Sequence, residues 1–175
     1  TINLFGSTAS GGHAAGDTLT GIENLIGSAY ADRLTGSALA NSFWGNDGDD
    51  QMLNLSGNDS LNGQDGDDAL FGGEGIDVLG GGEGKDGLFG EAGNDSLYGG
   101  YGDDYLSGGE GNDVIWGEGG DDNIDAGAGN DFAVLGSGDD VFTLGLGDDR
   151  VRFDYGNGAD TIRDFGNGRD VLDFT

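Results

Sequence analysis

The sequence predicts an all-β fold, a right-handed parallel β-roll (a β-solenoid) of 18-residue coils with a C-terminal β cap. Three observations predict it. An aspartate recurs every nine residues from position 50 to position 149, twelve times without a gap. A glycine lies two residues before each of these aspartates, and an apolar residue lies two residues after it. Glycine makes up 41 of the 175 residues, and each would cost a helix roughly 0.8–1 kcal/mol, so turns and strands are expected instead.

Each nine-residue unit is predicted to form a six-residue turn followed by a three-residue strand whose middle side chain points inward. The stretch GGEGIDVLG at 72–80 shows the pattern, with Asp77 at the end of the turn and Leu79 in the middle of the strand. Two turns and two strands close one coil. Coils then stack at about 4.8 Å, which gives two parallel sheets that face each other across a thin apolar core.

The repeat predicts a single domain over residues 1–175. Residues 1–22 are expected to form a lead-in and N-terminal cap, in which residues 1–5 alternate like a strand. Residues 23–152 carry the repeats. Residues 153–175 are expected to form capping strands, because two Gly-Asn-Gly turns separate alternating apolar segments there. A cap at each end would cover sheet edges that otherwise invite aggregation.

The composition points to cations as partners. The chain has 34 acidic against 6 basic side chains and a formal net charge of −28. Phosphates repel such a chain, which argues against nucleic acid and anionic membranes. No cysteine is present to form disulfides or thiolate zinc sites, and no apolar run approaches the roughly 20 residues of a membrane span. We expect the chain to be a segment of a larger protein.

Aspartates that are two repeats apart should lie one above another, which creates two ladders of carboxylates. One edge of the predicted roll carries Asp50, Asp68, Asp86, Asp104, Asp122 and Asp140. The other edge carries Asp59, Asp77, Asp95, Asp113, Asp131 and Asp149. Carboxylates about 5 Å apart repel by roughly 3 kcal/mol at an effective dielectric near 20, so the ladders need cations between their rungs.

Calcium is the cation that this pattern favours. Carboxylate and carbonyl oxygens, six to eight per ion, are the ligands that Ca²⁺ prefers, whereas Mg²⁺ demands an octahedral site and Zn²⁺ favours histidine or cysteine. The only histidine is His13. Each ion is expected to lie between aspartates n and n+18, which gives roughly five sites on each ladder and about ten Ca²⁺ ions in all.

The repeat resembles the RTX (repeats-in-toxin) family, whose nonapeptide is GGxGxDxUx with U a large apolar residue. The best copies occupy residues 72–80, 81–89, 99–107 and 108–116, and the resemblance covers roughly residues 18–175. It implies that the aspartate of each turn binds calcium together with backbone carbonyls of earlier turn positions. The candidate carbonyls are those of Gly72, Gly81, Gly90, Gly99, Gly108 and Gly117.

Some copies depart from this pattern. The turns at 27–32 and 36–41 lack the fourth-position glycine, and Asn41 replaces the aspartate of the second one, so we expect strands there without a full ion site. The turns at 54–59, 135–140 and 144–149 lack the first glycine, so we expect weaker ions there.

The resemblance also implies a function. RTX proteins are typically exported by type I secretion from Gram-negative bacteria and fold outside the cell. The expected function is therefore an extracellular or cell-surface calcium-binding module that serves as a carrier or stabilising segment. We expect no catalysis, because no serine, cysteine or histidine constellation can be assembled. A catalytic domain would belong to the rest of the larger protein.

Two surface features leave alternatives open. Outward positions hold one row of Leu53, Phe71 and Phe89 and another of Tyr98, Trp116 and Val134. These rows are either scattered surface groups or a docking face, which would make the chain an adhesin, surface-layer or polysaccharide-binding module, or dock a neighbouring domain. Arg150, Arg152, Arg163 and Arg169 lie near the C-terminus and either cap the last carboxylates or form ordinary solvated pairs.

Overall fold

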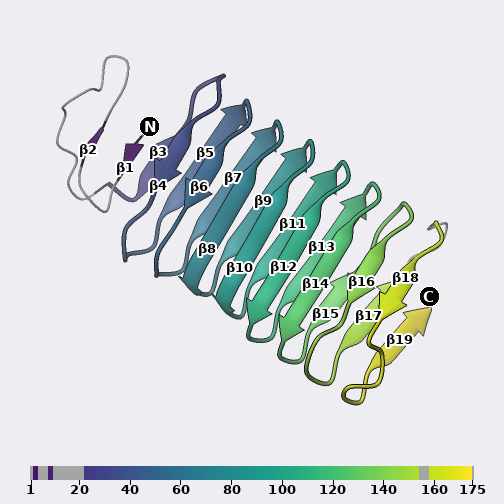
Figure 1. Ribbon diagram of the computed structural model, residues 1–175. Helices are drawn as coiled ribbons and strands as arrows, with labels where there is room; N and C mark the ends of the chain where they lie inside the picture. Colours follow the sequence, from purple (N-terminus) through teal and green to yellow (C-terminus); the bar gives the residue numbers. More distant parts are fainter. Residues whose placement is uncertain (1, 4–7, 10–21, 154–157, 175) are drawn as a thin grey trace.

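The computed structural model describes residues 2–3, 8–9, 22–153 and 158–174, and these residues form 19 strands in a stack of parallel coils. Successive coils follow one another along a single axis from the N-terminal to the C-terminal end (Figure 1). The described residues contain no helix that could cross a membrane. The predicted all-β parallel solenoid is confirmed.

From β3 onward the strands belong alternately to two sheets, because the chain crosses from one sheet to the other in every turn. The ten-stranded sheet contains β1 (Ile2–Asn3), β2 (Thr8–Ala9), β4 (Arg33–Thr35), β6 (Gln51–Leu53), β8 (Ala69–Gly75), β10 (Gly87–Gly93), β12 (Tyr105–Glu110), β14 (Asn123–Ala128), β16 (Val141–Thr143) and β18 (Thr161–Arg163). The nine-stranded sheet contains β3 (Asn24–Ile26), β5 (Ser42–Asp47), β7 (Ser60–Asp65), β9 (Val78–Glu83), β11 (Ser96–Tyr101), β13 (Val114–Gly119), β15 (Phe132–Val134), β17 (Arg150–Phe153) and β19 (Val171–Phe174).

The register of the repeat region follows the predicted 18-residue coil. Leu88 of β10 pairs with Leu70 of β8 on one side and with Leu106 of β12 on the other. In the nine-stranded sheet, Leu97 of β11 pairs in the same way with Leu79 of β9 and Ile115 of β13. The 18-residue step therefore places equivalent side chains of successive coils in register along the stack.

The core is a single file of apolar side chains between the two sheets. Each strand of the repeat region contributes the residue two positions after the turn aspartate, such as Leu79, Leu88 and Ile115, and these side chains are fully buried. At the C-terminal end, Ala126, Leu135 and Leu144 add further buried side chains from the turns. The core is thin, so the turns must contribute to holding the coils together.

The C-terminal strands continue the stack instead of forming a separate structure. Phe142 of β16 pairs in parallel with Ile162 of β18, and Val151 of β17 pairs in parallel with Leu172 of β19. Both steps exceed two repeats, so the two last coils are longer than the others. Ile162 and Leu172 pack against the core. The capping role of these strands stays a prediction.

At the N-terminal end, β1 adds to the ten-stranded sheet by pairing in parallel with β4, and β2 pairs with β1 in antiparallel fashion. The strand predicted at 1–5 is thus present at Ile2–Asn3. The remainder of the predicted lead-in, including His13, lies outside the described residues except for Thr8, Ala9 and Ile22.

The two outward rows are present and their rings stack on one another. Phe71 and Phe89 lie parallel with centroids 4.7 Å apart, and Tyr98 and Trp116 lie parallel with centroids 4.5 Å apart. Val134 continues the second row but is only 4% exposed, so it is not available to a partner as the sequence led us to expect. The accessible part of that row is the Tyr98–Trp116 pair.

Candidate metal sites

The twelve repeat aspartates form two ladders at opposite edges of the roll. We number turn positions one to six, so that the aspartate is sixth. The first edge is formed by turns 45–50, 63–68, 81–86, 99–104, 117–122 and 135–140, where the chain passes from the nine-stranded to the ten-stranded sheet. The second edge is formed by turns 54–59, 72–77, 90–95, 108–113, 126–131 and 144–149, where the chain passes back.

One oxygen of each carboxylate belongs to a hydrogen-bonded ladder. The backbone N–H of Asp77 donates to Oδ1 of Asp95 at 2.8 Å, and that of Asp104 donates to Oδ1 of Asp122 at 2.9 Å. At the other sixth positions, the backbone N–H likewise donates to Oδ1 of the aspartate 18 residues later. This series begins at Asp32 on the first edge and at Asn41 on the second. These hydrogen bonds hold each carboxylate in its orientation without the help of an ion.

The second oxygen of each carboxylate is buried without a partner. In all twelve aspartates Oδ2 is inaccessible to solvent and accepts no hydrogen bond. Burial raises the pKa of Asp122 to about 8 and the pKa of Asp95 to about 7; the backbone hydrogen bond from the preceding coil lowers each pKa, and the neighbouring carboxylates raise it further. A buried charge without a partner is costly, so each of these oxygens requires a proton or a cation.

The first-position glycines leave room for a backbone oxygen beside this carboxylate oxygen. A Cβ added at Gly90 would lie 2.6 Å from Oδ2 of Asp95 and 2.6 Å from the carbonyl oxygen of Gly108. A Cβ added at Gly99 would meet Oδ2 of Asp104 and the carbonyl oxygen of Gly117 at the same distances. A carboxylate and a carbonyl of the next coil therefore face one small space.

The candidate carbonyls follow this arrangement. Five of the six predicted carbonyl oxygens face an Oδ2 in this way, those of Gly81, Gly90, Gly99, Gly108 and Gly117. The sixth predicted carbonyl, that of Gly72, lies one coil after Asn54. Because Asn54 is not a glycine, the space beside a first-position glycine does not exist there, and the same arrangement is not shown for the Gly72 carbonyl. The prediction missed the carbonyls of Gly45, Gly63, Ala126 and Leu135, which face an Oδ2 at the same turn position.

The donor set fits calcium. Within the described ranges, no three side chains of the types His, Cys, Asp and Glu come together as a metal-binding group. The oxygens that share a space in these turns are a carboxylate Oδ2 and a backbone carbonyl, as at Asp95 and Gly108. Carboxylate and carbonyl oxygens are the donors that Ca²⁺ accepts in its six- to eight-fold, flexible coordination.

The N-terminal turns that depart from the repeat satisfy their oxygens with hydrogen bonds. Oδ2 of Asp32 accepts from the backbone N–H of Ser28 at 2.7 Å and from its hydroxyl at 2.8 Å. Oδ1 of Asn41 accepts from the backbone N–H of Ser37 at 2.8 Å. These contacts favour the expectation that turns 27–32 and 36–41 lack a full ion site.

The ladders extend beyond the last nonapeptide, which the sequence analysis missed. The backbone N–H of Asp140 donates to Oδ1 of Asp160 at 3.1 Å, and that of Asp149 donates to Oδ1 of Asp170 at 3.2 Å. Oδ2 of Asp170 accepts from the backbone N–H of Gly166, so this last carboxylate has both oxygens engaged. The Gly-x-Asp pattern at 158–160 and 168–170 was the available signal, but its spacing departs from nine.

Side chains at the first turn position alter the space beside the carboxylate. Leu135 and Leu144 are fully buried at this position. At the equivalent Gly117, a Cβ would lie 2.6 Å from Oδ2 of Asp122, so a leucine competes with an ion for room. This favours the expectation of weaker ions in turns 135–140 and 144–149. Ala126 is a further departure that the sequence analysis did not single out.

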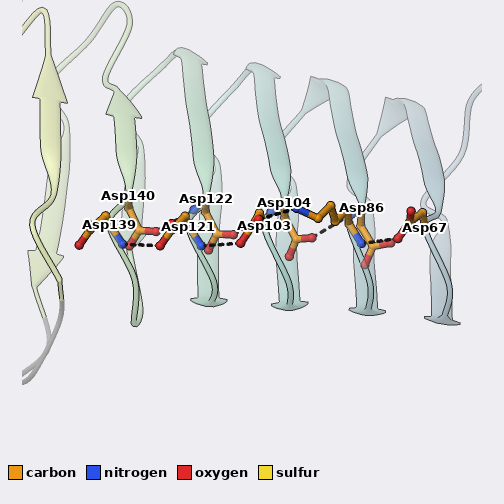
Figure 2. A network of polar contacts seen from close by, with 9 residues as sticks. Asp67, Asp86, Asp103, Asp104, Asp121, Asp122, Asp139 and Asp140 are labelled. Atoms are coloured by element: carbon orange, nitrogen blue, oxygen red, sulfur yellow. Dashed lines mark hydrogen bonds and ion pairs between the residues drawn. The ribbon is translucent and has the colours of Figure 1, made fainter.

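A second row of side chains runs along each edge at the fifth turn position. Oδ1 of Asp103 accepts from the backbone N–H of Asp121 at 3.1 Å, and Oδ1 of Asp121 accepts from that of Asp139 at 2.8 Å. These side chains are exposed, and their bonds run in the opposite direction to those of the sixth position (Figure 2). The ammonium group of Lys85 pairs with Asp103 within this row.

Two of the C-terminal arginines pair with aspartates outside the sixth position. Arg169 binds Asp148 at 2.8 Å, and Arg150 pairs with Asp173. Their side chains are 90% and 59% exposed, so each pair contributes little to stability. For these two residues, the solvated Arg–Asp pair is the better interpretation.

Comparison with protein families accounts for the same residues. The family model described as RTX calcium-binding nonapeptide repeat (4 copies) matches residues 17–52, 26–61, 44–79, 62–97, 80–115, 98–133 and 116–151. These overlapping matches cover residues 17–151, well over half of the chain. A search of curated proteins finds no match. The chain therefore belongs to the RTX calcium-binding nonapeptide-repeat family, and it is a calcium-binding β-roll module.

Proposed function

We propose that this calcium-binding β-roll is a conditional folding module of a secreted bacterial protein. It stays unfolded where calcium is scarce, in the bacterial cytoplasm, and folds on binding Ca²⁺ outside the cell. Calcium-binding repeats of this family are typical of secreted bacterial proteins, which supports the extracellular location. In this role the module acts as a carrier or stabilising segment for the larger protein.

One observation carries the proposal, namely the twelve buried carboxylate oxygens without hydrogen-bond partners. At neutral pH without a cation, closing the roll would bury these charges in two rows and repel them from one another. The thin core offers limited compensation. The ion sites exist only in the folded chain, so binding free energy becomes folding free energy.

We assign each ion a place between successive turns of one edge. Its ligands would be Oδ2 of the sixth-position aspartate and carbonyl oxygens of the neighbouring turns, including the first-position carbonyl of the next coil. Roughly five ions per edge, about ten in total, correspond to the spaces between rungs that carry two aspartates. The metal content of the purified chain, determined by mass spectrometry under native conditions, tests this number.

Circular dichroism in the far ultraviolet tests the folding step. At pH 8 the chain should lack β signal in excess EGTA and gain it on addition of Ca²⁺, with a midpoint near 10⁻⁴–10⁻³ M, the range of extracellular calcium modules. Magnesium at the same concentration should produce much less signal, because it needs octahedral geometry and gives up its water reluctantly. A chain that is equally folded in EGTA would contradict the proposal.

A second candidate function, an adhesin, surface-layer or polysaccharide-binding module, is favoured by the outward aromatic strip. Phe71, Phe89 and Tyr105 form a continuous contact, with the last two centroids 5.6 Å apart. The stacked rings turn their faces toward one another, so a flat apolar partner fits this strip better than a sugar ring that must stack on an open face. Glycan arrays and self-assembly assays with Phe71→Ser and Trp116→Ser test it, and unchanged binding in both variants would exclude it.

A further inference from the structure

The two edges of the roll carry different charges at the fifth turn position. On the first edge this position is acidic in five of six turns, with residues Asp49, Asp67, Lys85, Asp103, Asp121 and Asp139. On the second edge it is neutral in five of six turns, with residues Asn58, Ile76, Asn94, Asn112, Asn130 and Asp148. The alternation of Gly-Asp-Asp with Gly-Asn-Asp every nine residues is thus a difference between opposite sides of the molecule.

The geometry of the fifth position is the same on both edges. On the second edge, Oδ1 of Asn94 accepts from the backbone N–H of Asn112, and Oδ1 of Asn112 accepts from that of Asn130, both at 2.7 Å. On the first edge, Oδ1 of Asp103 and Asp121 make the equivalent bonds to the next coil. The side-chain atom that takes no part in this bond is the charged Oδ2 of aspartate on the first edge and the neutral Nδ2 of asparagine on the second. The edges therefore differ in charge while they share a backbone arrangement.

Other turn positions add to this difference. Apart from the sixth-position aspartates, the six turns of the first edge contain nine acidic residues and one lysine. The corresponding turns of the second edge contain four acidic residues, one of which, Asp148, is paired with Arg169 at 2.8 Å. The buried ladders themselves are equal, with six aspartates on each edge.

We infer that the two edges hold calcium with different affinity, and that the first edge holds it more tightly. A carboxylate about 7 Å from a divalent ion strengthens binding by a factor of about two with salt screening and about seven without it. Each proposed first-edge ion has a fifth-position carboxylate in at least one of the two turns that flank it. When free calcium falls, the second edge loses its ions first. This inference rests on the proposed position of the ions between successive turns.

Lys85 interrupts the row of negative charges on the first edge. Its backbone N–H donates to Oδ1 of Asp67 at 2.9 Å, and its ammonium group pairs with Asp103. It therefore places a positive charge in the row directly beside Asp86. The ions that share Asp86 should be held less tightly than the other ions of this edge that lie between turns beginning with glycine.

Two matched triple variants test the inference. Asp103→Asn, Asp121→Asn and Asp139→Asn together remove the fifth-position negative charges from the last three turns of the first edge, and Asn94→Asp, Asn112→Asp and Asn130→Asp add three such charges to the second edge. Both variants keep the Oδ1 acceptor that bonds to the next coil, so the fold is retained. Calcium release from the saturated protein is followed by stopped-flow mixing with a fluorescent chelator at low ionic strength, and calcium-saturated circular dichroism checks the fold.

The wild type should release calcium in a fast and a slow phase of similar amplitude. The first variant should accelerate the part of the slow phase that comes from ions beside the substituted turns, about two- to sevenfold for each carboxylate removed, without changing the fast phase. The second variant should slow the corresponding part of the fast phase by a similar factor for each carboxylate added. Both differences should shrink in 1 M salt, where the Debye length is about 3 Å. A single phase in the wild type, or a shift of both phases in either variant, would overturn the inference while calcium-dependent folding stands. Failure of the wild type to fold on adding calcium would instead overturn the proposed function.

Discussion

At the scale of the residue, the two oxygens of each turn aspartate have separate tasks. Oδ1 accepts a backbone hydrogen bond from the preceding coil, and Oδ2 is left buried for an ion. Asp95 allows the tasks to be separated, because Oδ1 of Asp95 accepts from the backbone N–H of Asp77. Asparagine can keep the first task but supplies no charge for the second.

We expect Asp95→Asn to lower the calcium content while the calcium-bound fold persists, and Asp95→Ala to cost a further 1–3 kcal/mol or so because a buried N–H loses its acceptor. Urea unfolding in saturating calcium measures the difference between the two variants, and native mass spectrometry measures the ions. Hydrogen exchange on the opposite edge, at Asp86 and Asp104, should be nearly unchanged. Equal destabilisation by both substitutions would show that Oδ1 has no separate role.

The fourth-position glycine has a steric task that no other residue can perform. Gly84 has φ +136°, and a Cβ there would lie 2.0 Å from the carbonyl oxygen of Gly66. Gly80 lies on an outward strand position, where the nearest atom to a Cβ would be Nδ2 of Asn62 at 3.5 Å. These two glycines therefore form a matched pair within one turn and its flanking strand.

We expect Gly84→Ala to reduce the free energy of unfolding in calcium by about 2 kcal/mol or more, because both the backbone conformation and the contact are unfavourable. Gly80→Ala should change it by less than about 1 kcal/mol. Urea titration in saturating calcium measures both variants. Similar values for the two would mean that the neighbouring coil yields easily at this position.

At the scale of the element, the coil is the unit that the sequence predicts well. The period of nine residues led to the 18-residue register and to the inward residues such as Leu79 and Leu88, because both follow from position within the repeat. The same reasoning failed where the coil lengthens. Asp160 and Asp170 keep their place in the ladders across these longer coils, and a fixed period cannot find them.

The fifth-position row was missed for a different reason. Asn, Asp and Lys vary at this position in the sequence, and variation resembles an unconstrained surface. The hydrogen bonds of this row need only a side-chain Oδ1, which both asparagine and aspartate have, as at Asn112 and Asp121. Only the stacking of coils shows that the two residue types separate onto opposite edges.

The coil containing Asn41 and Asn54 provides a test of how an ion site arises. Asn54 is 2% exposed, and its Oδ1 lies 2.0 Å from the point that a Cβ of Gly36 would occupy. Oδ1 of Asn41 lies 2.7 Å from the same point. Amide oxygens thus occupy the space that a carboxylate and a carbonyl share elsewhere, without the charge that balances Ca²⁺.

We expect the double variant Asn41→Asp with Asn54→Gly to bind one additional calcium ion, because it restores both residues of the repeat at this rung. Native mass spectrometry in calcium counts the ions. Asn62→Asp, which adds a carboxylate on an outward strand position, is the control and should leave the count unchanged. The same count in the wild type and the double variant would mean that the local hydrogen bonds of Ser37, or the missing fourth-position glycine, prevent a site.

At the scale of the whole molecule, calcium and protons compete for the same buried oxygens. Burial raises the pKa of the ladder carboxyls above the usual 3.8, to about 8 for Asp122, about 7 for Asp68 and about 6 for Asp86. In the unfolded chain these groups keep their ordinary pKa. Without calcium, the folded state therefore binds more protons than the unfolded state, and acidification favours folding.

The sign of this linkage gives a prediction for the calcium-free chain. The stabilisation by protons is fully present below the unfolded pKa of 3.8 and is lost as the pH rises through the folded values of about 6 to 8. Circular dichroism in EGTA should accordingly show β signal that grows as the pH falls from 8 toward 5. The double variant Asp68→Asn with Asp122→Asn should show a shallower dependence, because two of the largest pKa shifts are removed.

In the folded chain, calcium and protons should replace one another on the ladder carboxylates. Ca²⁺ requires the ionised carboxylates, whereas the unfolded chain has already lost these protons above pH 5.5. Protonation and calcium therefore both favour folding, and the calcium concentration at the folding midpoint should fall as the pH falls from 7.5 to 5.5. Where acid has already folded the calcium-free chain, near pH 5.5, calcium binding should release protons into an unbuffered solution. A pH-stat measures the release directly. An acid-folded chain that binds calcium without releasing protons would show that the buried oxygens of the ladders are not the calcium ligands.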